Sequence, residues 1–264
     1  MEHSRTILLD VLNMESLRRA ITTTKAKTVI NCAGLTSVDI CESHPEASVL
    51  VNAVGASNVS QAVQEEGLRL IHISTDHFAS SSQVPRTETD PVFAVNQYGF
   101  AKLLAEGFIT AQNPNALVLR TNFFGSSSSK KETFFNQILQ KFTEGQQVQG
   151  FHDITFSPIG IETLCAFIQT QLFASTKGLV NVVGGQELTK LDFAIEVKNA
   201  LADSRSSIHA TSIKDAGLLA KRPSYMSLSI ERLTGEFGFS PPSLSHMIGQ
   251  EIEIAQRLST SSRI

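Results

Sequence analysis

Residues 28–34 read TVINCAG and residues 68–76 read LRLIHISTD. Each stretch is a nearly continuous apolar run that ends in small or hydroxyl-bearing residues, which is typical of a strand buried on both faces of a parallel sheet. Between them, residues 45–66 carry apolar side chains at helical spacing, and Gly67 is placed to end that helix. The order strand, helix, strand predicts two parallel strands joined by a crossover helix.

The same alternation continues along the chain and predicts a Rossmann-like α/β fold, a doubly wound parallel sheet with helices on both faces. Asn13 is a suitable N-cap for a helix over residues 13–24. The further segments predicted as helices are residues 97–112, 132–144, 161–172, 188–201 and 243–257. Those predicted as strands are residues 5–9, 115–121 and 178–183.

Two units are expected. Residues 1–125 would form the Rossmann-like domain, with residues 161–185 returning to it, and residues 126–160 and 186–264 would form a smaller substrate-binding lobe. This division follows the change from regular strand–helix alternation to a mixed pattern after the polar loop at residues 126–131.

Composition excludes several classes of protein. The net charge of −3 and the absence of a Lys/Arg run argue against a nucleic-acid partner. No apolar stretch reaches the roughly 20 residues that span a bilayer, and no secretory signal is visible, so a cytoplasmic protein without a membrane partner is expected. Cys32, Cys41 and Cys165 are distant from one another and read as reduced thiols. No cluster of His, Asp and Glu predicts a metal site, and His72, His77 and His152 read as ordinary polar residues.

Three pieces of sequence could carry chemistry. Tyr98 and Lys102 lie four residues apart and share one face of a helix. A neighbouring ammonium favours the phenolate and lowers the pKa of a tyrosine, which suits it to general acid–base catalysis. Ser74, Thr75 and Asp76 follow a strand at the sheet edge where ligands bind, and a hydroxyl there can polarise a carbonyl.

The third piece is the small-residue end of the preceding strand, residues 31–34, which lets a cofactor pass close to the backbone. Each piece alone has an ordinary structural explanation: a half-exposed Tyr with a solvated Lys, a hydroxyl cap, and a tight turn. Their order along one chain favours a shared active site.

The successive motifs resemble those of the extended short-chain dehydrogenase/reductases, most closely the dTDP-4-dehydrorhamnose reductase branch. The resemblance is strongest from residue 10 to residue 125 and continues weakly to the RPS segment at residues 222–224. The motifs that carry it are VINCAGLTSVD (29–39), VNAVG (51–55), HISTD (72–76), YGFAKLLAE (98–106) and LRTNFFG (119–125).

The resemblance implies NADPH- or NADH-dependent reduction of a 4-keto nucleotide sugar, as in dTDP-rhamnose biosynthesis. Tyr98 would be the catalytic acid, Lys102 its pKa-lowering and ribose-binding partner, and Thr75 (or Ser74) the carbonyl-polarising hydroxyl. The implied cofactor-binding residues are Asp10, Val11, Cys32, Ala33, Gly34, Asn52, Ser74, Tyr98, Lys102 and Asn122. The implied substrate-binding residues are Thr75, Asp76, Phe123 and Arg222.

The sequence departs from that family at its beginning. The family starts with a strand, a glycine-rich turn and a helix that holds the pyrophosphate, and no such glycine motif occurs in this sequence. Residues 1–10 match the segment that leads into the family's third strand. Without the strands that normally lie beside it, the strand at residues 28–33 is expected to have an open edge, which a second copy or another chain could cover. The choice between NADH and NADPH depends on a segment that is not present.

Other departures affect the loops around the site. His77-Phe78-Ala79-Ser80 follows Ser-Thr-Asp where the family has a different pattern, and Phe123 replaces a usual Trp. Two further functions therefore stay open: a non-catalytic binding protein on this scaffold, like the regulatory β subunit of methionine adenosyltransferase, or a nucleotide-sugar epimerase or dehydratase. A start that lies further upstream and a naturally short protein are both compatible with the sequence.

Overall fold

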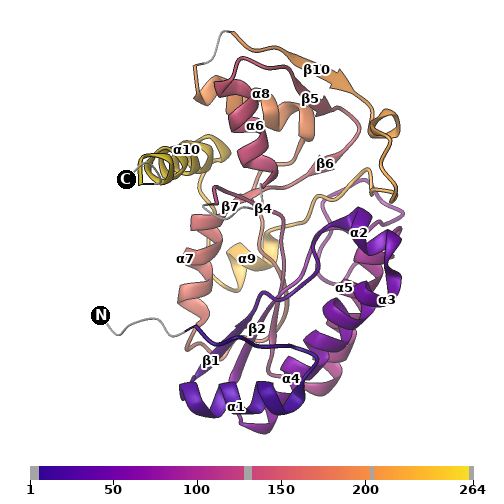
Figure 1. Cartoon of the computed structure of the whole chain (residues 1–264), viewed down its shortest axis with the longest axis vertical. Coiled ribbons are helices and arrows are strands. Elements are labelled where there is room, and N and C mark those ends of the chain that lie inside the picture. The colour runs from indigo at the N-terminus through magenta and orange to yellow at the C-terminus, as the bar shows by residue number, and fades with distance from the viewer. Residues whose placement is uncertain (1–5, 128–132, 203–204, 262–264) are drawn as a thin grey trace.

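A computed structural model describes residues 6–127, 133–202 and 205–261 of the chain. Its centre is a parallel four-stranded sheet in the order β1-β2-β3-β8 (Figure 1). The strands are β1 (Thr28–Asn31), β2 (Arg69–Ile73), β3 (Leu117–Arg120) and β8 (Gly178–Asn181). The predicted Rossmann-like fold is confirmed, and β8 pairs with β3 at one end of the sheet.

Alternation of side chains along the strands gives the sheet two apolar faces. Leu70 and Val118 point to one face and belong to a cluster that includes side chains of three helices. Ile71 and Leu119 point to the other face and join a larger cluster that continues into the C-terminal part of the chain. The helices of the first face are α1 (Met14–Thr24), α4 (Gly55–Glu65) and α5 (Gln97–Gln112), and those of the second include α7 (Ile161–Gln171) and α9 (Glu231–Gly235).

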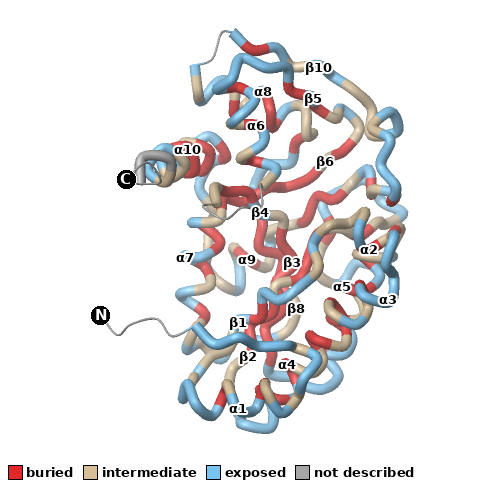
Figure 2. The backbone as a smooth tube through the Cα atoms, in the orientation of Figure 1, coloured by how far each residue is buried: buried red, intermediate tan, exposed pale blue. Residues whose placement is uncertain are grey.

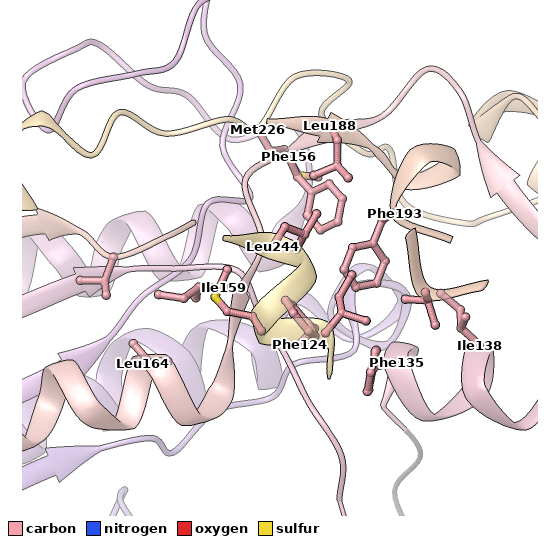
Figure 3. Close-up of a cluster of buried hydrophobic side chains, with 14 of the residues drawn as sticks. Phe124, Phe135, Ile138, Phe156, Ile159, Leu164, Leu188, Phe193, Met226 and Leu244 are labelled. Atoms are coloured by element: carbon pink, nitrogen blue, oxygen red, sulfur yellow. The ribbon is translucent and has the colours of Figure 1, made fainter. Parts of the chain in front are cut away.

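The C-terminal lobe is built around one buried aromatic side chain, Phe193. Its ring lies 5.0 Å from that of Phe124 and 5.7 Å from that of Phe156, measured between centroids (Figure 3). These contacts belong to the same hydrophobic cluster as one face of the central sheet, so the core runs without a break from the sheet into the lobe. The helices of the lobe are α6 (Phe134–Thr143), α8 (Lys190–Ala200) and α10 (Leu244–Ser261), and a 3-10 turn covers Ile213–Ala216.

Short strand pairs complete the lobe and connect it to the sheet. The parallel pair β5–β10 lies at the far end of the molecule (Figure 1). Two further pairs, β4–β7 and β6–β9, lie between this end and the sheet. Their bounds are β4 (Phe123–Phe124), β5 (Val148–Phe151), β6 (Thr155–Phe156), β7 (Ile159–Gly160), β9 (Leu188–Thr189) and β10 (Ile208–Thr211).

One predicted strand was wrong. Residue 5 lies outside the described residues, but residues 6–9 form no strand, and Leu8 is 99% exposed. This segment belongs to no sheet, and Figure 2 shows it running exposed across the sheet end. The helix predicted over residues 45–66 is present, with a π-helical turn, Leu50–Val54, between α3 (Pro45–Val49) and α4. A separate short helix, α2 (Val38–Ser43), was not predicted.

The predicted open edge is confirmed among the residues that the structure describes. There, β1 pairs with β2 alone and stands at the end of the sheet. Ile30, in the middle of β1, is 41% exposed. An exposed backbone edge of this kind can pair with another strand.

Candidate active site

A cavity of about 840 Å³ lies where β1, β2 and β3 reach their carboxyl ends. Twelve of the fourteen predicted site residues line it, so residues from six separate sequence segments meet in one place. They are Cys32, Ala33, Gly34, Asn52, Ser74, Thr75, Asp76, Tyr98, Lys102, Asn122, Phe123 and Arg222. Ligands of doubly wound sheets bind at this edge.

Tyr98 is placed by the first turn of α5. The N-cap Asn96 accepts a hydrogen bond from the Gly99 N–H at 2.8 Å, and its amide donates to the Lys221 carbonyl at 2.8 Å. A Cβ on Gly99 would lie 2.8 Å from the His77 carbonyl oxygen, so only glycine allows the helix to approach the loop after β2 this closely. As a result the His77 ring meets Tyr98 edge-on at 5.8 Å.

The two hydroxyls at the end of β2 have different roles. Ser74 donates to the carboxylate of Glu106 at 2.6 Å, and Glu106 forms a buried ion pair with Arg120 at 2.7 Å. The Thr75 oxygen accepts the His77 N–H at 3.2 Å, and a hydrogen bond links its hydroxyl to that of Tyr98. Of the two, Thr75 is therefore the hydroxyl that suits the carbonyl-polarising role.

The protonation of Tyr98 differs from the expectation. Burial raises its pKa to about 12, and the Asp76 carboxylate adds to this, while a hydrogen bond with Thr75 lowers it. Lys102 was expected to lower this pKa, but its ammonium nitrogen contacts the Ile73 carbonyl at 2.7 Å and the ring of His72 at 3.3 Å instead. Tyr98 in this arrangement is a stable proton donor.

Asp76 and Asn122 form the side of the cavity nearest the lobe. The Asn122 amide donates to the Asp76 carboxylate at 2.6 Å. Asp76 is 2% exposed, and burial raises its pKa to about 6, although the hydrogen bond from Asn122 opposes that rise. Phe123, the next residue, is 51% exposed at the cavity wall.

Lys190 was not predicted. It is the first residue of α8, fixed there by a capping box between Thr189 and Asp192. Its ammonium lies 3.3 Å from the ring centroid of Phe156 and 4.9 Å from that of Phe134, and among the described residues it has no hydrogen-bond acceptor. Burial lowers its pKa to about 8, against the attraction of Asp76. A cation beside aromatic rings in a cavity is suited to an anionic ligand.

Some of the predicted cofactor-binding residues line the cavity and others do not. Residues 32–34 form a turn against the cavity, held by Asn52, whose amide bonds both the N–H and the carbonyl of Leu35 at 2.8 and 3.0 Å. Asp10 and Val11 do not line this cavity. The Asp10 carboxylate accepts the Leu12 N–H, and Val11 packs against Gly55.

Arg222 joins the two parts of the chain at the cavity mouth. Its guanidinium lies 3.1 Å from the carboxylate of Asp39 on α2, and the Ala220 N–H donates to the same carboxylate at 3.0 Å.

Two other features are absent from the residues that the structure describes. No group of three His, Cys, Asp or Glu side chains there could hold a metal ion. No helix there is long and apolar enough to cross a membrane.

Residues 3–256 match the family described as "RmlD substrate binding domain". The chain belongs to this family. Among curated relatives, dTDP-4-dehydrorhamnose reductase of Salmonella typhimurium is 26% identical over 91% of this chain and 83% of its own length. A probable low-salt glycan biosynthesis reductase of Haloferax volcanii is 27% identical over 89% of this chain and 80% of its own length.

Solved structures show the RmlD-type fold directly. The dTDP-4-dehydrorhamnose reductase of Bacillus anthracis, in complex with NADP, superimposes with a TM-score of 0.85 at 24% identity. That match covers 93% of this chain and 86% of the other. A hypothetical dTDP-4-dehydrorhamnose reductase of Sulfolobus tokodaii gives 0.79 at 25% identity, over 94% and 89% of the two chains.

Proposed function

We propose that this protein catalyses the NAD(P)H-dependent reduction of a 4-keto nucleotide sugar. The observation that carries the proposal is the meeting of Thr75, Tyr98 and Lys102 in one cavity at the carboxyl end of the sheet. Several curated relatives are dTDP-4-dehydrorhamnose reductases, and a related structure holds NADP. Cofactor and site residues are carried to this chain on that basis.

Tyr98 supplies the proton of the reaction. Because its pKa is about 12, it is protonated at neutral pH and can give its proton to the carbonyl oxygen. Thr75 donates a hydrogen bond to the same oxygen and stabilises the negative charge that develops there. Solvent then returns a proton to Tyr98, so one proton is consumed for each carbonyl reduced.

The residues at the turn after β1 fit the reactive end of a nicotinamide cofactor. A Cβ on Gly34 would lie 3.0 Å from the Asn52 amide oxygen, so the turn is packed on that side and presents a bare backbone to the cavity. Residues 32–34 would hold the cofactor at this turn, and Lys102 and Tyr98 would face its ribose. When bound, the reduced nicotinamide supplies a hydride to the carbonyl carbon.

We place the nucleotide sugar on the lobe side of the cavity. Lys190 would bind a diphosphate oxygen, because its ammonium is the cation there without an acceptor among the described residues. Phe123 offers an exposed ring for stacking, and the Asp76–Asn122 pair can hydrogen-bond sugar hydroxyls. Arg222 would close the mouth from the opposite side.

The test is turnover of a dTDP-4-keto-6-deoxyhexose by the purified protein. Tyr98→Phe keeps the ring and removes the donated proton, so we expect a loss of roughly 10²–10⁴-fold in kcat with little change in binding. Phe100→Leu on the exposed face of α5 serves as a control and should keep wild-type activity. A Tyr98→Phe protein with wild-type turnover would exclude this mechanism.

A second candidate is a non-catalytic binding protein on the same scaffold. It is favoured by the position of Lys102, which contacts His72 and the Ile73 carbonyl rather than Tyr98. The two candidates differ in cofactor affinity. An NADPH dissociation constant weaker than about 1 mM would favour the binding protein, and a micromolar one the reductase.

A further inference from the structure

His72 lies directly beneath the active-site cavity and takes no part in the proposed chemistry. It sits on β2 with no exposed surface. Its Nδ1 is 3.1 Å from the side-chain nitrogen of Asn31 on β1, and its Nε2 is 3.3 Å from Nζ of Lys102 on α5. The imidazole therefore connects the edge strand to the lysine of the Tyr-x-x-x-Lys pair.

The Asn31 amide decides which ring nitrogen of His72 carries the proton. The amide oxygen of Asn31 accepts the Ala33 N–H at 3.1 Å, which fixes the orientation of the group. The NH₂ group must then face His72 and donate to Nδ1. A neutral imidazole with Nδ1 as acceptor carries its proton on Nε2.

That tautomer places an N–H opposite Lys102. An ammonium has no lone pair and cannot accept this hydrogen bond, whereas a neutral amine can. A neutral Lys102 satisfies every contact at once, because it accepts from Nε2 of His72 and donates to the Ile73 carbonyl at 2.7 Å. A doubly protonated imidazole is disfavoured, because burial holds the pKa of His72 well below its usual range.

The other groups around Lys102 do not reverse this arrangement. Burial lowers the pKa of Lys102 to about 8, although Glu106 and Cys32 raise it. Glu106, one turn further along α5, is already paired with Arg120. Cys32 faces the lysine from the end of β1. Burial raises the pKa of its thiol, and Cys165 on α7 raises it further against the opposing effect of Lys102, which keeps the thiol uncharged.

We propose that His72 is a positioning residue that donates from Nε2 to Lys102 and stabilises the neutral amine form of this lysine, so that Lys102 loses its proton at a lower pH than an ordinary lysine. The consequence for catalysis rests on the proposed function. Above the pH at which Lys102 loses its proton, the neutral amine leaves Tyr98 without an adjacent positive charge, so Tyr98 keeps its proton until a carbonyl is bound. Asn31 acts on Lys102 indirectly, because it fixes the tautomer of His72.

The test is the titration of Lys102 by NMR in the full chain labelled with ¹³C at the lysine ε carbons. The signal missing from a Lys102→Arg sample identifies Lys102, and no substrate or cofactor is needed. The wild-type midpoint is expected near pH 8. Asn31→Asp should raise the Lys102 midpoint by about one pH unit or more, on the order of one unit per lost hydrogen bond. The new carboxylate accepts a hydrogen bond from Nδ1 of His72, so the lone pair of the imidazole lies on Nε2 and favours the ammonium form of Lys102.

Two further variants complete the experiment. His72→Phe removes the donor and should raise the midpoint by about one unit. Asn115→Asp adds the same charge as Asn31→Asp at an exposed position and should leave the midpoint unchanged. A wild-type midpoint near the usual lysine value, or one that Asn31→Asp leaves in place, would overturn the proposal. Absence of turnover with the expected titration would count against the proposed reaction alone.

Discussion

Replacement of Lys190 by Met should weaken the binding of a nucleoside diphosphate without weakening the fold. The ammonium lies over the ring of Phe156 at 3.3 Å and finds no hydrogen-bond acceptor among the described residues. A phosphate oxygen would supply that acceptor. A hydrogen bond to a charged group contributes about 1.5–3 kcal/mol, so loss of the ammonium should raise the Kd for dTDP roughly 10- to 100-fold.

The pH dependence separates this effect from a general disturbance of the cavity. The pKa of Lys190 is about 8, so the wild-type affinity for dTDP should fall as pH rises from 7 to 9 and the ammonium loses its proton. The Lys190→Met protein should lack that part of the fall. Lys102 titrates in the same range, but it is present in both proteins, so the difference between them reports Lys190.

The free energy of unfolding should change with pH in the opposite direction to the affinity for dTDP. Between pH 8 and the usual lysine value of 10.5, the unfolded chain binds the proton of Lys190 more tightly than the folded chain. Stability therefore rises with pH in this window, and at pH 7 the buried charge costs stability. We expect Lys190→Met to have an unchanged or higher Tm at pH 7.

Isothermal titration calorimetry with dTDP measures the affinity, and Lys141→Met, on an exposed position of α6, is the matched control. A Kd for Lys190→Met within about twofold of wild type would refute the assignment of Lys190 to the diphosphate. So would an equal pH dependence in both proteins.

Two further predictions concern the residues that hold the site. Gly99→Ala places a Cβ 2.8 Å from the His77 carbonyl oxygen and should lower the free energy of unfolding by about 1–3 kcal/mol. In the control, Gly107→Ala on the same helix, the new Cβ has nothing within 4 Å, and this variant should be neutral or stabilising. Denaturant titration compares the two variants, and equal stabilities would contradict the close approach of Gly99 to His77. Asp76 has a pKa near 6 in the folded chain against a usual 3.8, so the folded chain holds its proton more tightly and wild-type stability should fall as pH rises between these values. Asp76→Asn should remove that slope in thermal melts from pH 4 to pH 6, and a persisting slope would assign it to another group.

Local signals predicted the elements that carry the site. The helix of Tyr98 and Lys102 runs over the expected residues, Gln97–Gln112. The strand ends at Asn31 and Ile73 lie where small and hydroxyl residues interrupt apolar runs. Such features depend on neighbouring residues, and sequence patterns report them directly.

Features that depend on distant residues were not predictable. The apolar residues at positions 6–9 form no strand because a strand needs a partner, which a local pattern does not supply. Asn52 lies in the π-helical turn, and its side chain accepts a hydrogen bond from the N–H of Leu35, seventeen residues earlier. Lys190 lines the cavity because the lobe folds back toward the sheet, which no local pattern shows. The raised pKa of Tyr98 follows from burial, which the four-residue spacing to Lys102 does not reveal.

The transfer of deuterium from NADPH labelled at its reactive carbon tests the central claim most directly. Incubation of the protein with this cofactor and a dTDP-4-keto-6-deoxyhexose should place one deuterium at carbon 4 of the sugar and consume one cofactor per product. Mass spectrometry and NMR of the product measure both. An epimerase or dehydratase would return the cofactor to its starting state, and a binding protein would leave the sugar unlabelled; either result would contradict the proposed reduction.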